Sequence, residues 1–278
     1  MVPLDRVREH ERMEMEYWRD WYEAAPPEVA AHLGHAFEVV EGAYLLILSK
    51  LDVPVFNRVL GLGLEKPATE AQVDGIIARY KAAGSSRFFV SVSPGAEPAS
   101  AVSWLEARGF RRFNRWAKVE RGVEPVPAVT TDARIEEVGP EHARTFGDVL
   151  CRGVGLPEGM GEWMGKWAGR LLGRQGWRIY MAFDGAKAVG AAGTFVKGEW
   201  ASLGFAATLP EARGRGVQSA LIARRIQDAR AMGCLLLSSE TAEDTPDRPA
   251  PSFHNLTRLG FELAYYRENH LGTTQPSA

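Results

Sequence analysis

The clearest structural signal is one stretch, which reads Trp200-Ala-Ser-Leu-Gly-Phe-Ala-Ala-Thr-Leu-Pro-Glu-Ala-Arg-Gly-Arg-Gly-Val-Gln-Ser-Ala-Leu221. Small and apolar residues at 201–208 predict a strand buried on both faces, and Pro210 ends it. Residues 213–216 then form a basic, glycine-rich turn, and a helix follows at once and runs to Met232. The first N–H groups of a helix lack intrahelical partners and carry partial positive charge. This order of strand, glycine turn and helix therefore predicts a site for an anion such as phosphate.

The composition is that of an ordinary globular protein. Of 278 residues, 45% are hydrophobic and 24% are charged, which argues against disorder and against fibrous structure. At this length the chain forms one large domain or two domains of ordinary size. The formal net charge of -2 argues against general binding to nucleic acid or to anionic membranes.

No segment resembles a membrane span or a secretory signal. The longest apolar run, at 43–48, has the length of a strand, and the N-terminal residues are acidic rather than apolar. Cys151 and Cys234 fall in separate predicted elements and are expected to be buried, reduced thiols. We therefore expect a cytoplasmic protein without a membrane partner, and we predict no metal site.

The order of predicted helices and strands repeats in the two halves of the chain. The first half has predicted helices at 4–24, 69–83 and 99–107 and predicted strands at 37–40, 44–48, 57–64, 87–92 and 113–119. The second half has predicted helices at 140–150, 163–172, 218–232 and 252–259 and predicted strands at 135–138, 177–183, 189–196, 200–208, 234–239 and 261–267.

Two further observations support related halves. A segment rich in small residues and proline, 122–133, separates them and is predicted as a linker. Near the end of each half, Leu105-Glu-Ala-Arg-Gly-Phe110 is echoed by Leu256-Thr-Arg-Leu-Gly-Phe261. These patterns predict an α/β fold, a mixed sheet flanked by helices, in two domains at residues 1–122 and 134–270.

The residues from Thr208 to Leu221 resemble the acyl-CoA-binding motif of the GCN5-related N-acetyltransferases (GNAT), summarised as Gln/Arg-x-x-Gly-x-Gly/Ala between a strand and a helix. Arg213 and Gly216 match this motif, whereas Gln218 stands where the family usually has Gly or Ala. The order of elements across residues 135–267 also resembles the family. The resemblance implies two tandem GNAT-like domains, the first a degenerate copy, with acetyl-CoA or another acyl-CoA as co-substrate.

The resemblance also implies where acyl-CoA binds. Backbone N–H groups of the turn and the first helical residues are expected to bind its pyrophosphate: Arg213, Gly214, Arg215, Gly216, Val217, Gln218 and Ser219. The pantetheine arm is expected to lie along Phe205, Ala206 and Ala207, and to contact Ser252 and Asn255. The alternatives are a strand-to-helix turn without a ligand and an RNA contact of the Arg-Gly-Gly type, which the slightly acidic chain disfavours.

The first half lacks the features of this turn. Its corresponding segment reads Gly61-Leu-Gly-Leu-Glu-Lys-Pro67, in which Glu65 repels a pyrophosphate and Pro67 has no N–H donor. We therefore expect the domain at 1–122 not to bind CoA, and instead to shape the acceptor cleft or to stabilise the pair of domains.

The chemistry implied by the resemblance is direct acyl transfer, in which the amine loses a proton and the leaving thiolate gains one. Glu240, after the predicted strand 234–239, is predicted as general base or acceptor anchor, with an ordinary surface carboxylate as the alternative. Many family members have a Tyr that protonates the thiolate where this chain has Leu256. His254, Tyr265 or water are the candidates to replace it, although a histidine such as His254 is more often an ordinary surface or packed residue.

We therefore expect an acetyl-CoA-dependent N-acetyltransferase that acts on an amine of a small molecule or of a protein. The alternative is a catalytically silent acyl-CoA-binding sensor or scaffold, which Leu256 in place of a tyrosine leaves open. A third possibility, aminoacyl transfer from charged tRNA, needs a basic groove that a net charge of -2 does not indicate. The sequence identifies neither the acceptor nor the oligomeric state.

Overall fold

The structure is a computed structural model that describes residues 2–274. The described chain forms two compact units: residues up to Ala117 together with those from Ala264 form unit 1, and Lys118–Leu263 forms unit 2. Strand β5 (Arg111–Arg121) begins in unit 1 and ends in unit 2, and strand β11 (Glu262–Thr273) begins in unit 2 and ends in unit 1. The chain therefore leaves unit 1 once and returns to it.

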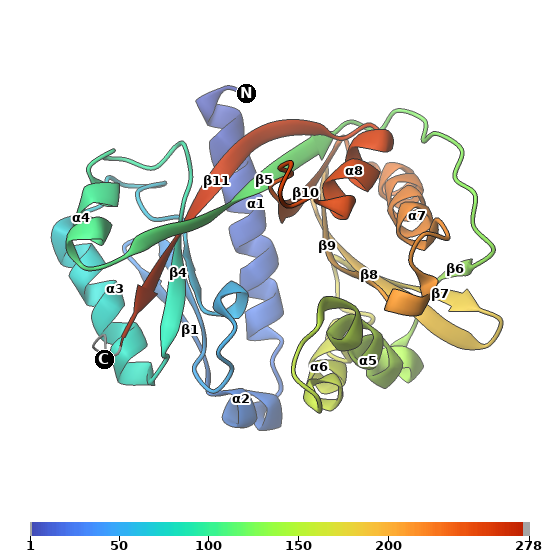
Figure 1. The fold of residues 1–278 in the computed structure, drawn as a ribbon, viewed down its shortest axis with the longest axis horizontal. Helices are drawn as coiled ribbons and strands as arrows, with labels where there is room; N and C mark the ends of the chain where they lie inside the picture. Colours follow the sequence, from blue (N-terminus) through green and yellow to red (C-terminus); the bar gives the residue numbers. More distant parts are fainter. Residues whose placement is uncertain (1, 275–278) are drawn as a thin grey trace. The chain divides into compact units, whose positions relative to one another are not determined.

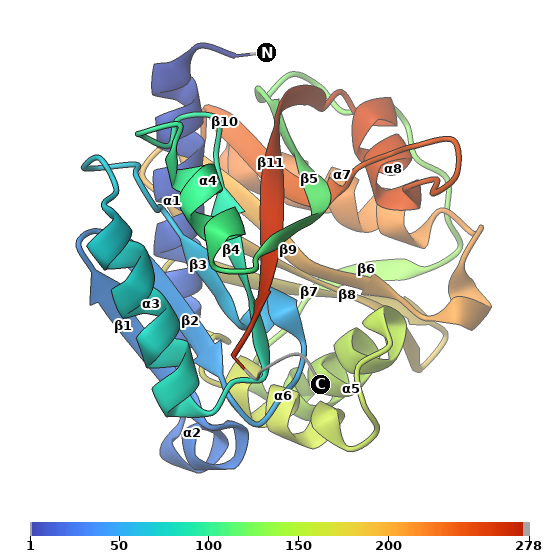
Figure 2. The same cartoon turned by 60° about the vertical axis from the view of Figure 1, so that its left-hand side comes forward.

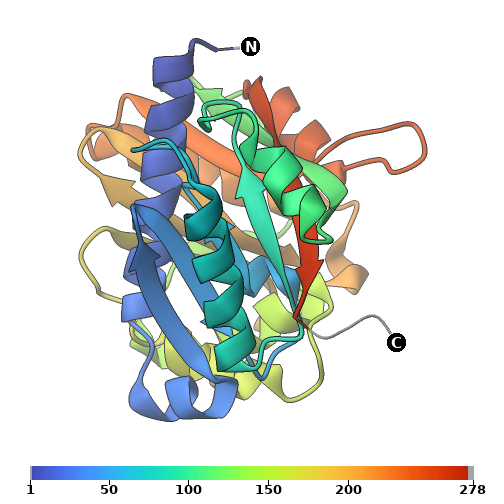
Figure 3. The same cartoon turned by 90° about the vertical axis from the view of Figure 1, so that its left-hand side faces the viewer.

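Unit 1 is a mixed sheet with helices on both faces (Figure 1). Its helices are α1 (Leu4–Glu23), α2 (Pro27–Leu33), α3 (Glu70–Ala83) and α4 (Ala101–Ala107). Its sheet has the order β1 (His35–Val40), β2 (Ala43–Leu48), β3 (Arg58–Leu60), β4 (Arg87–Val92), β11 and β5, of which β4, β11 and β5 are seen side by side in Figure 2. β3 and β4 run parallel, whereas β1–β2, β2–β3 and β4–β11 are antiparallel pairs. Figure 3 shows α3 in front of this sheet, and α1 lies on its other face.

Each face of this sheet has its own apolar core. On the side of α3, the ring of Tyr80 stacks on that of Phe88 with 3.8 Å between centroids. On α1, aromatic residues three and four positions apart form one buried stripe of Trp18, Trp21 and Tyr22. This spacing places them on one face of the helix, which explains why α1 packs on its own unit.

A cluster of buried charges joins α1 to β11 within unit 1. Arg267 on β11 donates to Glu11 at 3.1 Å and to Glu14 at 3.0 Å, and Arg58 on β3 donates to Glu14 at 2.7 Å. Tyr265 donates a further hydrogen bond to Glu11 at 2.6 Å. The four charged side chains are at most 7% exposed, so each charge depends on its partners for compensation.

Unit 2 also contains strands of mixed direction, with α5 (Ala143–Val154) and α6 (Met160–Ala168) on one face of them and α7 (Val217–Ala231) and α8 (Pro251–Arg258) on the other (Figures 1 and 2). Its strands follow the order β10 (Leu236–Ala242), β9 (Trp200–Thr208), β8 (Lys187–Lys197), β7 (Trp177–Asp184) and β6 (Arg134–Glu137). β9 and β10 are parallel, and the other neighbouring pairs are antiparallel. Single 3₁₀ turns at Pro54–Phe56, Pro140–His142 and Pro210–Ala212 complete the two units.

The fold class predicted from the sequence is confirmed, because both units are mixed sheets flanked by helices in the same chain order. The central strand at 200–208 has the predicted bounds. The strand predicted at 57–64 covers only 58–60, since Gly61 has a positive φ of 77° and turns the chain. Cys234 precedes β10 instead of starting it, because its N–H bonds to the end of α7 at Ala229, 3.0 Å away.

The predicted second domain, 134–270, does not coincide with unit 2. Residues 264–270 belong to unit 1, where β11 pairs with β4 from Glu268 onward. The segment 122–133, predicted as a linker, belongs to unit 2. The alternation of apolar residues identifies a strand but not the sheet that it joins, which explains the difference at the end of the chain.

Candidate functional site

The middle of β9 contains a bulge. Between Gly204 and Ala207, two residues of β9, Phe205 and Ala206, lie opposite a single residue of β8. Phe205 has a φ of 45°, a left-handed conformation that costs a non-glycine residue about 1–2 kcal/mol. Its ring stacks on Trp177 with 5.9 Å between centroids, which helps to hold this conformation. Backbone strain held in place by packing is a feature of functional sites.

A buried arginine supports the bulge. Arg225 on α7 is 2% exposed, and its guanidinium donates to the carbonyl oxygen of Gly193 at 3.1 Å and of Gly204 at 3.4 Å. These two residues lie on the two strands that the bulge interrupts. Because buried carbonyl groups need donors, Arg225 stabilises the irregular backbone that the bulge creates.

β9 and β10 separate just before the bulge. Their parallel pairing ends at Leu203 and Ser239, although β9 continues to Thr208 and β10 to Ala242. Within the described chain, no strand pairs with residues 204–208 on the side of β10. An extended ligand can therefore bind to the backbone of β9 there as an added strand does.

The glycine turn after β9 leads into α7 without a side-chain cap. Gly214 and Gly216 have φ values of 76° and 74°, which residues with a Cβ rarely adopt. Gly216 is the N-cap of α7, and no side chain caps this end of the helix. A Cβ on Gly216 would overlap the carbonyl oxygen of Thr130. The open N–H groups and partial positive charge of α7 are therefore presented beside a backbone that only glycine allows.

The corresponding turn of unit 1 is closed. There the hydroxyl of Thr69 caps α3 by accepting a backbone hydrogen bond at 3.1 Å. Arg12 donates to Glu65 at 2.6 Å and Arg8 donates to Glu97 at 2.8 Å, and these residues line a space of only about 210 Å³. Ligand pockets usually begin at about 300 Å³. The turn of unit 1 thus lacks the open helix end of unit 2, and the absence of CoA binding in the first half stays a prediction.

In unit 2 the same position opens into a cavity of about 1330 Å³. The turn, the start of α7, the end of α5, part of α8 and the segment 127–132 line this cavity. All but two of the predicted cofactor residues belong to this lining. Those that do are Ala206, Arg213, Gly214, Arg215, Gly216, Val217, Gln218, Ser219, Ser252 and Asn255. The exceptions, Phe205 and Ala207, lie on the adjoining part of β9. The structure therefore brings the predicted cofactor residues together around a single space.

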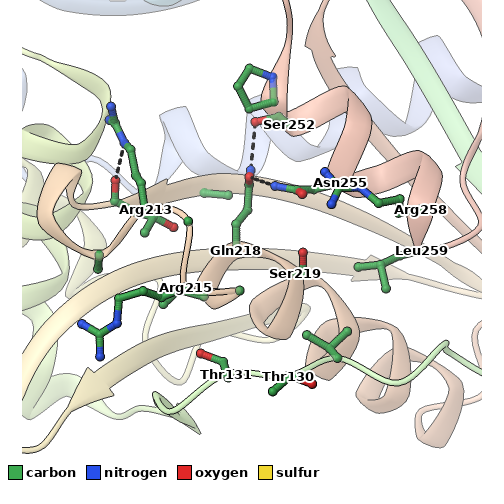
Figure 4. Close-up of a pocket in the computed structure, with 18 of the residues that line it drawn as sticks. Thr130, Thr131, Arg213, Arg215, Gln218, Ser219, Ser252, Asn255, Arg258 and Leu259 are labelled. Atoms are coloured by element: carbon green, nitrogen blue, oxygen red, sulfur yellow. Dashed lines mark hydrogen bonds between the residues drawn. The ribbon is translucent and has the colours of Figure 1, made fainter.

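Arg213 and Arg215 both line this cavity but make different contacts (Figure 4). Arg213 donates to backbone oxygen atoms, including that of Gly153 at 3.1 Å. Arg215 lies between two carboxylates, at 2.7 Å from Asp184 and 2.5 Å from Asp132. These hydrogen bonds raise the pKa of Arg215, and the bond from Arg215 lowers the pKa of Asp132. The positive charge of Arg215 is thus compensated by carboxylates, whereas within residues 2–274 Arg213 contacts backbone carbonyl groups and forms no ion pair.

Gln218 connects α7 to α8 at the cavity (Figure 4). Its Nε2 donates to Oγ of Ser252 at 2.8 Å, and its Oε1 accepts from Nδ2 of Asn255 at 2.5 Å. Gln218 on one predicted helix is therefore hydrogen-bonded to both Ser252 and Asn255 on another. The departure from the Gly or Ala of the family motif has a structural role, because a smaller residue cannot make this connection.

The chemistry of the lining suits a ligand that contains phosphate. Oγ1 of Thr208, a lining residue at the end of β9, is buried and has no hydrogen-bond partner among residues 2–274. Of the described lining residues, Asp132 alone is acidic, and it is paired with Arg215. Open N–H donors, an unsatisfied hydroxyl and uncompensated positive charge together fit an anion better than a neutral ligand.

The predicted catalytic residues lie outside the described lining. Glu240 is on β10 just past the point where β9 and β10 separate, and its carboxylate is 3.6 Å from Nζ of Lys118 and 19% exposed. His254 is half exposed, and its Nε2 is 3.0 Å from Asp244, which also accepts the N–H of Ala250 at 2.7 Å. His254 thus contacts the loop before α8, and its role as proton donor to the thiolate stays a prediction.

Two further positions supply no proton donor to the cavity. Leu256 is 4% exposed and belongs to the buried apolar residues of unit 2. Tyr265 lies in unit 1, where it donates to Glu11, and burial raises its pKa. Neither side chain therefore lies where it could protonate a thiolate in the cavity.

One wall of the cavity was missed by sequence reasoning. The segment 127–132 was predicted only as a linker, yet it lines the cavity, and Thr130 lies against the glycine turn. Thr208 and Arg258 were missed as well. The small residues and prolines of the segment indicate a loop but give no signal of what the loop contacts.

The comparisons with known proteins agree with this geometry. The sequence profile described as the Acetyltransferase (GNAT) family matches residues 154–261. The chain is similar to a solved tandem GNAT protein from the clavulanic acid biosynthesis pathway, without AcCoA, with a TM-score of 0.53 and 18% identity over 75% of this chain and 70% of that chain. It is also similar to a GCN5-related N-acetyltransferase from Kribbella flavida, with a TM-score of 0.60 and 16% identity over 90% of this chain and 94% of that chain. No curated protein matches the sequence significantly.

Residues 154–261 therefore form a domain of the GNAT family, and the chain has the fold of a tandem GNAT protein. The resemblance stated from the glycine turn is confirmed. This fold supports acyl transfer from acyl-CoA in general, and its family uses acyl-CoA as co-substrate. Within residues 2–274, no helix combines the length and the apolar character that crossing a membrane requires.

Proposed function

We propose that unit 2 binds acetyl-CoA, or another acyl-CoA, and transfers its acyl group directly to an amine of a small molecule or of a protein. One observation carries this proposal: the uncapped N-terminus of α7 opens into the cavity of about 1330 Å³ beside the unpaired edge of β9. An anion-binding helix end and a strand edge at the same place suit a ligand that has a pyrophosphate and an extended amide-containing arm.

Different groups of the chain bind different parts of the acyl-CoA. The N–H groups at the start of α7 and in the glycine turn bind the pyrophosphate, at roughly 1.5–3 kcal/mol for each hydrogen bond to a charged group. The free edge of β9 at Phe205, Ala206 and Ala207 binds the arm. Ser252 and Asn255 are held by Gln218 where they can contact the arm from α8.

The transfer step requires a base and a group that stabilises negative charge. The amine nitrogen attacks the thioester carbonyl, a C–N bond forms, the C–S bond breaks, and the proton lost by the amine is balanced by one gained by the thiolate. Backbone N–H groups at the bulge of β9 stabilise the oxyanion. Glu240, beside the gap between β9 and β10, accepts the amine proton or anchors the acceptor, and water protonates the thiolate.

The alternative is a module that binds acyl-CoA without turning it over. It is favoured by two observations: Leu256 is buried in place of an acid, and Glu240 is ion-paired with Lys118 outside the cavity lining. Neither observation affects the binding part of the proposal.

One experiment tests binding and turnover together. Acetyl-CoA binding is measured by calorimetry, and release of the CoA thiol is followed with a broad panel of amines. We expect saturable binding and thiol release that depends on one class of amine. Binding without turnover across the panel supports the sensor, and absence of binding to acetyl-CoA and to longer acyl-CoA contradicts both functions.

A matched pair of variants locates the binding. Ser219→Glu places a negative charge in the first turn of α7 at the cavity, and should weaken acetyl-CoA binding at least about ten-fold. Gln227→Glu makes the same charge change on an exposed position of the same helix and should leave affinity unchanged. Equal affinities of the two variants would show that the ligand binds elsewhere.

A further inference from the structure

The cavity extends beyond the glycine turn. Its lining continues from the start of α7 to Arg258 and Leu259 at the end of α8 on one side, and to the segment 127–132 on the other. Figure 4 shows Arg213 and Arg215 on one side of Gln218 and Arg258 on the opposite side, above Thr130. The arginines of the turn and Arg258 therefore cannot all serve the same small anionic group.

Arg258 has a guanidinium without a carboxylate partner. Its Nε donates to the carbonyl oxygen of His254 at 3.2 Å, which fixes the base of the side chain. Within residues 2–274, no ion pair involves Arg258, and the residue is exposed at the cavity. The charge of this guanidinium is therefore not compensated by a carboxylate of the described chain.

The ligand class of the proposed function carries two separate phosphate groups. The pyrophosphate joins the arm to the ribose, and a phosphate monoester at the 3′ position of the ribose has a charge of roughly -1.5 to -2 near neutral pH. The open end of α7 satisfies only one of these groups. A second cation at the far end of the same cavity is what the second phosphate needs, and the fork of an arginine matches it.

We propose that Arg258, opposite the segment 127–132, binds the 3′-phosphate of the coenzyme A moiety, so that unit 2 distinguishes acyl-CoA from its 3′-dephospho form. This inference rests on the proposed function. Asp132, the one acidic residue of the described lining, is held by Arg215 and leaves Arg258 uncompensated. Small and apolar residues at 127–129 give the nucleoside a wall without a competing charge.

The test compares two ligands across four proteins. Calorimetry gives the Kd of acetyl-CoA and of 3′-dephospho-acetyl-CoA for the unmodified protein, Arg258→Ala, Arg258→Lys and Arg230→Ala. Arg230 is an exposed arginine on α7 outside the cavity lining and serves as the matched control. For the unmodified protein and Arg230→Ala, the dephospho ligand should bind about ten-fold more weakly.

Arg258→Ala should bind both ligands with nearly equal Kd, while its affinity for the dephospho ligand stays that of the unmodified protein. Arg258→Lys should retain part of the difference, because the charge remains but the two-pronged geometry is lost. Equal binding of both ligands by the unmodified protein, or a full difference retained in Arg258→Ala, would overturn this inference and leave the proposed function intact. If neither ligand binds to the unmodified protein, the proposed function fails and the inference fails with it.

Discussion

Gln218 differs from the Gly or Ala of the family motif, and its side chain has a structural role in this protein. It is the second residue of α7, and its amide bonds Ser252 and Asn255 on α8. The sequence indicated that the position differs from the family motif, but it did not indicate the two partners. They lie 34 and 37 residues further along the chain, and no pattern in the sequence pairs them.

Gln218→Ala tests this connection. Two part-buried hydrogen bonds contribute about 1–2 kcal/mol together, so the free energy of unfolding should fall by that amount. The affinity for acetyl-CoA should fall about five- to ten-fold, because Ser252 and Asn255 are no longer held in place. Urea unfolding and calorimetry measure the two effects. Gln227→Ala on the exposed side of α7 is the control, and a Gln218→Ala protein that matches it in both measurements would contradict the role given to the amide.

The variant Glu240→Gln tests whether Glu240 is the general base or only an ion-pair partner of Lys118. If Glu240 accepts the amine proton, turnover should fall by roughly 10²–10⁴ while the affinity for acetyl-CoA stays the same. Lys118, its partner at 3.6 Å, supplies the comparison: Lys118→Gln should lower stability and change the rate per folded molecule far less. Thiol release, normalised to the folded fraction, measures both. A Glu240→Gln protein with full activity would leave Glu240 as an ion-pair partner only.

At the scale of the element, the turn between β9 and α7 contains two glycines with nearly the same φ and different surroundings. A Cβ on Gly214 meets no heavy atom within 4 Å, whereas a Cβ on Gly216 overlaps the carbonyl oxygen of Thr130. Gly214→Ala should therefore cost only the left-handed penalty of about 1 kcal/mol. Gly216→Ala should cost more and should abolish acetyl-CoA binding, because the turn or the segment 127–132 must move.

Thermal unfolding and calorimetry on this pair of variants report the result. Similar losses of stability and affinity in both variants would mean that the contact with Thr130 does not shape the site.

Sequence reasoning predicted elements well where one physical signal dominates. β4 and β9 have the predicted bounds, because continuous small and apolar residues between turn residues identify a buried strand. The open end of α7 was predicted for a similar reason, since helix ends and glycine turns have local causes. The bulge was not predicted. Gly204 is the residue expected to take a positive φ, yet Phe205 takes it, because its ring packs on Trp177.

At the scale of the whole molecule, the sequence predicted the repeated order of helices and strands, but it predicted only part of the cavity lining. Arg215 was predicted only as a residue of the pyrophosphate-binding turn, and its partners Asp184 and Asp132 lie 31 and 83 residues away in the chain. The wall at 127–132 likewise depends on where a loop without periodicity comes to rest. Contacts of this kind follow from the folded backbone, which local sequence patterns do not specify.

Unit 1 should be sensitive to mild acid. Burial lowers the pKa of His35 and of His270 below the ordinary value of 6.5. Because the unfolded chain then binds more protons than the folded one below about pH 6.5, stability is full above that value and falls as pH decreases toward the folded pKa. Urea unfolding midpoints between about pH 7.5 and pH 5 should show this slope. The double variant His35→Phe, His270→Leu should flatten it, and an unchanged slope would contradict the assignment.

The buried charges between α1 and β11 should matter strongly to stability. Arg267→Met leaves Glu11 and Glu14 buried with less positive charge nearby, and breaking a buried ion pair costs about 3–5 kcal/mol. Arg230→Met, at an exposed position, should change the free energy of unfolding by less than about 0.5 kcal/mol. Denaturant unfolding of the two variants decides the matter, and equal stabilities would show that strand pairing alone holds β11.

The return of β11 to unit 1 has a consequence for the order of events on the ribosome. The helix that carries Glu11 and Glu14 is made before unit 2, but Arg267, which compensates them, is made after it. At about 5–20 residues per second, the roughly 150 residues of unit 2 take about seven to thirty seconds to synthesise. Unit 1 therefore completes its fold only after unit 2 has been made, and during that interval the position of β11 in its sheet is open to strands of other chains.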